Sequence, residues 1–232
     1  MMEKDLAKEK LLAAKEAVKL VKTNQIVGLG SGSTAEIAIN ELALRMKNEG
    51  LTIKGVPSSN RTAELATSLG IPLIDINTIA RIDITIDGAD EFTPELFVLK
   101  GGGGALLKEK IVASMSREEI IIADSTKKVK TLGRFTLPME VIPFAYNYIL
   151  HELQLLNGFG KLRMKNNEDQ PYITDEGNNI IDADFGLITD PAALASKLKA
   201  IVGVVEHGIY INLATKVIMG EGDSVVTFGK QA

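Results

Sequence analysis

The chain has 232 residues and a mass of 25.0 kDa, enough for one large domain or two small ones with a buried core. Its net charge of −4, without clustered lysines or arginines, argues against a nucleic-acid partner or an anionic membrane surface. It contains no cysteine, which excludes disulfides, thiolate metal sites and a cysteine nucleophile and suits a reducing compartment.

The N-terminal segment predicts an amphipathic helix from about Lys4 to Val21, because apolar residues recur at helical spacing among alternating acids and bases. This segment lacks the continuous apolar stretch of a secretory signal, and its acids are atypical of a transit peptide. No segment reaches the length of a transmembrane helix. We therefore expect a cytoplasmic protein without a membrane partner.

Strands and helices alternate after this first helix. A short buried strand is predicted at Ile26–Leu29, followed by a helix at Ala35–Lys47. Ser33 or Thr34 is the expected N-cap of that helix, and Gly50 its C-cap.

The alternation continues as far as "EIIIAD". Segments 51–59 and 60–70 are predicted to form a strand and a helix. In "RIDITIDGADE", Ile82, Ile84 and Ile86 fall on one face of a predicted strand. "ALLKEKIVASMS" predicts a helix, and the apolar run "EIIIAD" predicts a strand buried on both faces. Such alternation indicates an α/β fold with a mostly parallel, Rossmann-like sheet and helices on both faces.

A different pattern begins near Gly133. After the proline-containing segment "GRFTLPMEVIPFA" we expect a helix at about 146–156 and two short strands, "YIT" and "NIIDADF", around the turn "DEGN". A second helix is expected with Asp190 as N-cap and Pro191 at its first position, followed by one strand, "GVVEHGIYI". This order indicates a smaller α+β ferredoxin-like domain.

The segment "ATKVIMGEGDSVVTF" predicts a final hairpin that returns to the large sheet. We therefore expect a large α/β catalytic domain formed by residues 1–133 and 210–232. The small α+β domain, residues 134–209, is inserted before the last strands.

Unusual stretches occur where predicted strands end, which is where open α/β sheets bind ligands. The first, "GLGSGSTA", combines glycines with Ser31, Ser33 and Thr34 at the start of a helix, as in a phosphate-binding turn. It is neither a Walker A motif nor a dinucleotide fingerprint, since serine stands at position 33. The alternative is a strand–helix turn capped by serine.

The second stretch, "DGADE", places Asp87 and Asp90 around a glycine turn at the end of a strand. Two carboxylates in this position can bind hydroxyls, transfer protons or hold a cation. The alternative, which is the more common one for an isolated motif, is an Asx turn that caps backbone amides. An EF-hand calcium site is not supported, because its ladder of oxygen ligands is missing.

The third stretch, "KGGGGALLKEK", contains four consecutive glycines between Lys100 and a helix that carries Glu109. Such a loop can form an anion-binding nest and let Lys100 and Glu109 approach one small ligand. Lys127 follows another predicted strand and is a further candidate for anion binding. Solvated surface charges are the alternative for all three side chains.

These residues together suit acid–base chemistry on a small phosphorylated carbonyl compound. A carboxylate would remove a proton next to the carbonyl, and a lysine with backbone donors would stabilise the resulting oxyanion. His151, in a predicted helix, and His207, in a predicted strand, are interpreted as structural, although His207 could line an interface. The sequence shows no metal-ligand cluster and no nucleophile–histidine pair.

Taken in order, "GLGSGSTA", "DGADE", "KGGGGALLKEK", "IIADSTKKV" and "GRFTLPMEVIPFA" resemble the motifs of type A ribose-5-phosphate isomerases. The similarity continues through "ITDEGNNIIDADF" and "GVVEHGIY" and so covers nearly the whole chain. The resemblance implies interconversion of ribose 5-phosphate and ribulose 5-phosphate in the non-oxidative pentose phosphate pathway. It also implies no metal or organic cofactor, and a homodimer or a tetramer of dimers.

The resemblance assigns a role to each matching residue. Glu109 matches the carboxylate that moves a proton between C1 and C2 through an enediolate, and Asp87 is implicated in ring opening. Burial would raise the pKa of Glu109 and Lys100 would lower it, and the sequence does not decide between them. The remaining matches are a substrate loop at Ser31, Gly32, Ser33 and Thr34, sugar contacts at Asp87, Gly88, Ala89 and Asp90, a reaction centre lined by Lys100, Gly101, Gly102 and Gly103, and a substrate-binding lysine at Lys127.

Other functions on a similar scaffold remain alternatives at this point. A deaminase or lactonase would need a catalytic histidine near the loops, where neither histidine of this chain falls. A related isomerase acting on a different aldose phosphate stays open. A sugar-phosphate-sensing regulator would need a DNA-binding helix-turn-helix, for which the chain has no room, and would not need Glu109 and Lys100 together.

Overall fold

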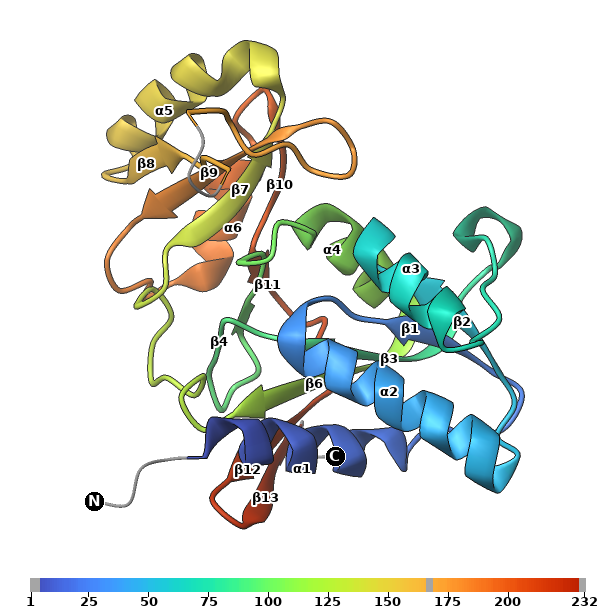
Figure 1. Ribbon diagram of the computed structural model, residues 1–232. Helices are drawn as coiled ribbons and strands as arrows, with labels where there is room; N and C mark the ends of the chain where they lie inside the picture. Colours follow the sequence, from blue (N-terminus) through green and yellow to red (C-terminus); the bar gives the residue numbers. More distant parts are fainter. Residues whose placement is uncertain (1–4, 166–168, 230–232) are drawn as a thin grey trace.

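The computed structural model describes residues 5–165 and 169–229 (Figure 1). Their strands form three sheets, with the orders β13-β12-β6-β3-β1-β2, β10-β7-β9-β8 and β11-β5-β4. Lys4, where the first helix was predicted to begin, and residues 230–232, at the end of the predicted large domain, lie outside the described residues.

The six-stranded sheet confirms the predicted α/β fold with a mostly parallel sheet. Strands β1, β2, β3, β6 and β12 run parallel to one another, and β13, the second strand of the predicted C-terminal hairpin, is antiparallel to β12. The strands are β1 (Gln25–Leu29), β2 (Ile53–Pro57), β3 (Ile82–Gly88), β6 (Ser116–Asp124), β12 (Lys216–Glu221) and β13 (Ser224–Gly229).

Helices cover this sheet and separate its two faces from water. α1 (Leu6–Val18) and α2 (Gly32–Glu49) pack together over one face, as Figure 1 shows. α3 (Asn60–Ser68) packs beside β2, and α4 (Leu106–Met115) packs on β3 and β6. Burial of the apolar residues of β1, β3 and β6 against α1 and α2 forms the main core.

The predicted N-cap of the second helix at Ser33 or Thr34 is wrong. α2 begins at Gly32, three residues before Ala35, with Ser31 as its N-cap in an extended conformation. The Ser31 hydroxyl makes no capping hydrogen bond, because it bonds to the Ser58 hydroxyl at 2.8 Å instead. The predicted C-cap, Gly50, is confirmed and has the left-handed backbone expected of a C-cap glycine.

The four-stranded sheet lies above the large sheet in Figure 1 and has two helices of its own. In chain order its elements follow the strand–helix–strand–strand–helix–strand pattern that the sequence predicts, and Asp190 caps the second helix. The elements are β7 (Leu137–Val141), α5 (Tyr146–Leu155), β8 (Phe159–Leu162), β9 (Asn179–Asp184), α6 (Pro191–Lys199) and β10 (Val204–His207).

Two details of this region were predicted wrongly. The segment "YIT" is not a strand and forms only isolated bridges, and the strand that pairs with β9 is β8. Gly160 lies within β8, although glycine is more typical of turns than of strands. A glycine is needed there because a Cβ at this position would lie 2.8 Å from side-chain atoms of Ile181 and Leu150. The division of the chain at residues 133/134 and 209/210 stays a prediction.

The segment "GVVEHGIYI" is two strands rather than the single one predicted. β10 ends at His207, and β11 (Ile209–Tyr210) joins a separate sheet with β5 (Val98–Leu99) and β4 (Glu91–Phe92). The chain changes sheets at Gly208, where a Cβ would lie only 2.1 Å from the Lys100 carbonyl oxygen. The Lys100 amide in turn donates to the Gly208 carbonyl at 2.9 Å. The backbone of Lys100 is therefore held at the point where the chain passes from one sheet to the other.

Short 3₁₀ turns at Ile76–Thr78 and Pro143–Ala145 complete the described elements. Among the helices of residues 5–165 and 169–229, none is long and apolar enough to span a bilayer.

Candidate active site

A cavity of about 120 Å³ lies where β1, β3 and β6 end, at the edge of the sheet where the sequence predicts a ligand site. The cavity is lined by every residue predicted to bind substrate except Asp87, which is buried directly beside it. It is also lined by Lys10 of α1, which was not predicted. The lining residues are Lys10, Ser31, Gly32, Ser33, Thr34, Gly88, Ala89, Asp90, Lys100, Gly101, Gly102, Gly103, Glu109 and Lys127.

The start of α2 forms one part of this cavity. The Ser31 amide donates to Asp87 Oδ1 at 3.0 Å, and the Ser31 side chain does not cap the first turn of the helix. Uncapped amides and the helix dipole favour an anion at this end. Lys10 Nζ lies 3.2 Å from Ser33 Oγ and adds a positive charge. Lys10 could not be found from the motif, because it lies far upstream on a helix whose other lysines are solvated.

Lys100 lies at the opposite part of the cavity and is almost fully buried. Its Nζ donates to the Gly88 carbonyl at 2.6 Å and lies 3.1 Å from Asp87 Oδ2 and 3.4 Å from Glu109 Oε1. Burial lowers the pKa of Lys100, but the carboxylates of Asp87 and Glu109 outweigh burial, so its pKa is raised overall. Lys100 therefore carries a fixed positive charge between two acidic side chains.

Glu109 projects from the first turn of α4 and is 6% exposed. Its Oε1 faces Lys100, whereas its Oε2 is buried and has no hydrogen-bond partner among the described residues. Burial raises the pKa of Glu109 to about 8, with Asp87 and Asp90 adding to the rise and Lys100 opposing it. The rise in the pKa of Glu109 that burial causes is therefore larger than the fall that Lys100 causes, a balance that the sequence did not decide. A carboxylate with one unpartnered oxygen and a near-neutral pKa suits proton transfer.

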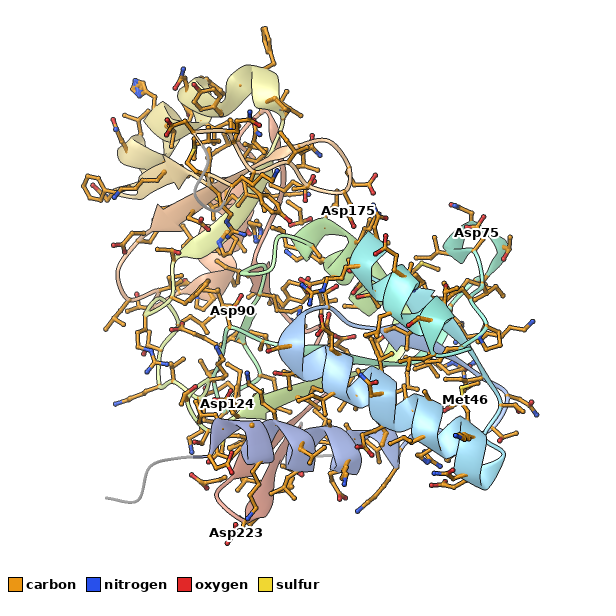
Figure 2. The ribbon with its side chains drawn as sticks, in the orientation of Figure 1. Met46, Asp75, Asp90, Asp124, Asp175 and Asp223 are labelled. Carbon is orange, nitrogen blue, oxygen red and sulfur yellow. The ribbon has the colours of Figure 1, made fainter. Side chains whose placement is uncertain are left out.

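Asp87 and Asp90 both accept hydrogen bonds from backbone amides. Asp87 Oδ1 accepts from the amides of Ser31 and Gly88, and Asp90 Oδ2 accepts from the Gly102 amide at 2.7 Å. Both carboxylates therefore cap backbone amides, as the Asx-turn alternative expected. Asp87 also pairs with Lys100. Asp90, labelled in Figure 2, lies near the start of α2 and lines the cavity with it.

Glycine is required at three of the four positions of this run, at two by the backbone conformation and at one by a neighbouring side chain. Gly101 and Gly104 have φ angles of +105° and +87°, which favour glycine. A Cβ on Gly102 would lie 2.6 Å from Asp90 Oδ1. At Gly103 nothing lies within 4 Å of the position of a Cβ, and this glycine lines the cavity. The absence of a side chain there leaves space on the cavity side of the loop.

Two further buried residues surround the reaction centre and were missed. Glu119 of β6 lies beside Thr85 of β3 on the same face of the sheet, and neither of its carboxyl oxygens has a hydrogen-bond partner among the described residues. Burial raises the pKa of Glu119 well above its ordinary value, and Asp87 adds to the rise. Tyr210 donates to the Leu106 carbonyl at 3.1 Å and so supports the first turn of α4. Neither residue belongs to a motif that marks it in the sequence.

The remaining candidates from the sequence are Lys127 and the two histidines. Lys127 lines the cavity from the loop after β6, whose backbone is held by the Phe92 amide donating to the Lys127 carbonyl at 2.9 Å. His151 is exposed on α5, and burial lowers the pKa of His207 to about 4. Neither histidine lines the cavity. Over residues 5–165 and 169–229, no group of three or more His, Asp or Glu side chains is placed to hold a metal ion.

The sequence and fold match known proteins over most of the chain. The family model for "Ribose 5-phosphate isomerase A (phosphoriboisomerase A)" matches residues 54–224. The ribose-5-phosphate isomerase A 1 of Oceanobacillus iheyensis is 44% identical over 94% of this chain and 96% of its own length. The Synechococcus ribose-5-phosphate isomerase A is 48% identical over 94% of this chain and 95% of its own length.

Solved structures agree with these sequence relatives. The ribose 5-phosphate isomerase A of Methanocaldococcus jannaschii superposes with a TM-score of 0.91 at 42% identity, covering 95% of this chain and 98% of its own. A D-ribose-5-phosphate isomerase in complex with phospho-erythronic acid superposes with a TM-score of 0.95 at 38% identity, covering 97% of this chain and all of its own.

Proposed function

The chain belongs to the ribose 5-phosphate isomerase A family, and from this premise we propose that it interconverts D-ribose 5-phosphate and D-ribulose 5-phosphate, a step of the non-oxidative pentose phosphate pathway. The observation that carries the proposal is the position of Glu109. One of its oxygens faces Lys100 and the other is unpartnered, and both residues line a cavity that begins at an uncapped helix N-terminus.

The substrate phosphate binds at the start of α2. Amides of the first turn, the hydroxyls of Ser33 and Thr34, and the ammonium groups of Lys10 and Lys127 supply positive potential there. The related isomerase that binds phospho-erythronic acid supports a ligand with both a phosphate and an acidic sugar end in such a cavity. With the phosphate at α2, the C1–C2 end of the sugar extends toward Lys100 and Glu109.

Proton transfer follows ring opening. Asp87, held by two amides and by Lys100, assists opening by accepting the proton of the O1 hydroxyl while the ring C1–O bond breaks and the released ring oxygen takes up a proton from water. Glu109 then removes the proton from C2 of the aldose, and the electron pair moves through C1 to its carbonyl oxygen to give the enediolate. The O2 hydroxyl proton moves to O1, the C2–O2 carbonyl forms, and Glu109 returns its proton to C1, which produces the ketose. Lys100 and the amides of the glycine loop stabilise the enediolate oxygen.

The chemistry requires no redox cofactor, since the reaction only moves a proton and an electron pair within one molecule, and we propose that it needs no metal. Proton NMR of the purified protein with ribose 5-phosphate in D2O containing EDTA tests both statements. We expect ribulose 5-phosphate with deuterium incorporated at C1, because Glu109 exchanges its proton with solvent in some turnovers. Absence of ribulose 5-phosphate would contradict the isomerase proposal. Activity abolished by EDTA would contradict the metal-free mechanism.

We propose a homodimer in the cytoplasm as the working state, with a tetramer of dimers as the alternative. Large apolar side chains are exposed around α5 and β8, with Phe144 at 98%, Phe159 at 73% and Leu155 at 66% exposure. Exposed apolar groups of this kind are typical of protein interfaces. The absence of cysteine suits a reducing compartment. Light scattering of the eluting protein tests assembly: about twice or four times 25.0 kDa is expected, and a monomer would contradict it.

A further inference from the structure

The glycine loop, residues 101–104, is bound on the side away from the active-site cavity by an arginine that directly follows a strand of the four-stranded sheet. Arg163, the residue after β8, donates from Nη1 to the carbonyls of Gly101 and Gly102, both at 3.1 Å. In Figure 1 the green segment that leads into α4 lies directly below this sheet. Arg163 does not line the cavity that holds Lys100 and Glu109, so it contacts the site only through the loop.

Arg163 is itself fixed on two sides. Its Nε donates to Asp182 Oδ2 at 2.8 Å, and its Nη2 pairs with Asp182 Oδ1 in a two-bond arrangement. Its guanidinium lies 5.9 Å from the centre of the Tyr172 ring. The Tyr172 hydroxyl lies 3.4 Å from the Gly103 carbonyl, and a Cβ on Gly104 would lie 2.4 Å from that hydroxyl. A planar guanidinium in such a setting has little rotational freedom to lose.

Anchoring these carbonyls also sets the direction of the amides. In a trans peptide the C=O and the following N–H point in opposite directions. The Gly101 carbonyl points to Arg163, and the Gly102 amide of the same peptide donates to Asp90, which lines the cavity. The next peptide has its Gly102 carbonyl on Arg163 too, so the Gly103 amide also points to the cavity side.

The loop needs such an anchor because it separates two cavities. Gly102 and Gly103 line the cavity of about 120 Å³ on one side and a cavity of about 600 Å³ on the Arg163 side. Four consecutive glycines have more backbone freedom than any other sequence of that length. Without the two bonds from Arg163, the peptides at Gly101–Gly103 keep only the bond of the Gly102 amide to Asp90, the bond of the Gly104 amide to the Gly101 carbonyl and the long contact of the Tyr172 hydroxyl with the Gly103 carbonyl. They then have more freedom to rotate into the larger space.

We propose that Arg163, oriented by Asp182, is a positioning residue that fixes the peptides of Gly101–Gly103 so that the Gly103 amide faces the reacting end of the substrate. This inference rests on the proposed isomerase function. It assigns the four-stranded sheet a part in catalysis, because that sheet supplies the anchor for the loop between Lys100 and Glu109.

Arg163→Met tests the proposal with Arg45→Met as a matched control. Arg45 is similarly buried, pairs with Glu49 and donates to the Val18 and Val21 carbonyls, but it lies at the far end of α2. We expect Arg163→Met to lower kcat about 100-fold, as for a displaced catalytic group, with KM changed much less. Arg45→Met should retain kcat. Wild-type kcat in a folded Arg163→Met protein would overturn the proposal.

Chemical rescue covers the case in which Arg163→Met fails to fold. Arg163→Ala leaves room for guanidinium, and millimolar guanidinium should restore part of kcat, whereas sodium chloride of equal ionic strength should not. Arg163→Lys keeps the charge but not the two-carbonyl contact and should remain impaired. Full activity of Arg163→Lys, or equal responses to the two salts, would contradict a positional role.

Hydrogen–deuterium exchange separates this proposal from the isomerase proposal, because it needs no turnover. In the ligand-free protein, Arg163→Met should increase exchange in a peptide covering residues 100–106, and Arg45→Met should not. Unchanged exchange would overturn the anchor even if the protein is an active isomerase. Increased exchange with no wild-type isomerase activity would leave the anchor standing and remove only the assigned reaction.

Discussion

The two ends of the cavity differ in how far they are shielded from water. At the reaction end, Asp87, Lys100 and Glu109 are 1%, 3% and 6% exposed. At the phosphate end, Ser33 is exposed and Lys10 and Lys127 are half-buried. Both ends contain lysine, but only Lys100 is held by a network of carboxylates at fixed distances.

This difference matches what each end has to do. Proton transfer needs a carboxylate whose pKa is near neutral, and burial is the largest cause of the raised pKa of Glu109. Binding a phosphate needs only positive potential, which acts through solvent and tolerates mobile side chains. Changes at the reaction end should therefore reduce kcat and stability, whereas changes at the phosphate end should raise KM.

Lys100→Met should have the largest effect. It removes the charge that stabilises the enediolate, so kcat should fall about 10²–10³-fold. It also leaves Asp87 buried without its partner, which should lower the free energy of unfolding by about 3–5 kcal/mol. Steady-state kinetics and urea denaturation measure the two losses.

Lys110→Met is the matched control for Lys100. Lys110 is also largely buried on α4 and pairs with Glu206 at 2.8 Å, but it does not line the cavity. It should lose stability and retain kcat. Equal kcat losses in the two variants would show that burial of any lysine near α4, rather than the position of Lys100, supports activity.

Lys127→Met should raise KM for ribose 5-phosphate about 10–100-fold, as expected for one charge-assisted hydrogen bond, and leave kcat within about twofold. Added salt should raise the wild-type KM through screening and affect the variant less. Lys128→Met is the control, because Lys128 is exposed and lies against the Phe228 ring instead of the cavity. A kcat loss in Lys127→Met would contradict the division of the cavity.

The pH dependence should report Glu109. Its pKa is raised to about 8 in the free protein, and it must be deprotonated to act as a base. Below that pH, kcat/KM should fall about tenfold per unit. Initial rates between mildly acidic and mildly alkaline pH give the profile. An acid limb at the ordinary pKa of a glutamate would show that Glu109 is not desolvated in solution.

Glu119→Leu should stabilise the protein by about 1–3 kcal/mol, the cost of a buried polar group without partners. The pKa of Glu119 is raised in the folded state, so above its ordinary pKa of 4.5 the unfolded chain binds fewer protons than the folded one. Wild-type stability is therefore lost as pH rises above that value, and the advantage of Glu119→Leu should grow with pH. Thermal melts at pH 4 and pH 7 test this, and a constant difference between the two proteins would contradict it.

Local pattern predicted most of the fold and of the cavity lining. β3, α4 and β6 are continuous periodic segments, and the motifs at strand ends lie together because parallel strands share a carboxyl edge. β4 and β5 were missed because each has only two residues. β11 was merged with the preceding strand, because it pairs with β5 only across a long sequence distance. Lys10 and Arg163 were missed for the same reason: tertiary packing alone brings each to its position.

The central claim is that Glu109 moves the proton, and the most direct test is the kcat of Glu109→Gln with ribose 5-phosphate. Glutamine keeps the shape of the side chain and removes its basicity. We expect kcat to fall about 10²–10⁴-fold, with KM within a few fold of wild type because the phosphate end is intact. A kcat near that of the wild type would show that Glu109 does not move the proton.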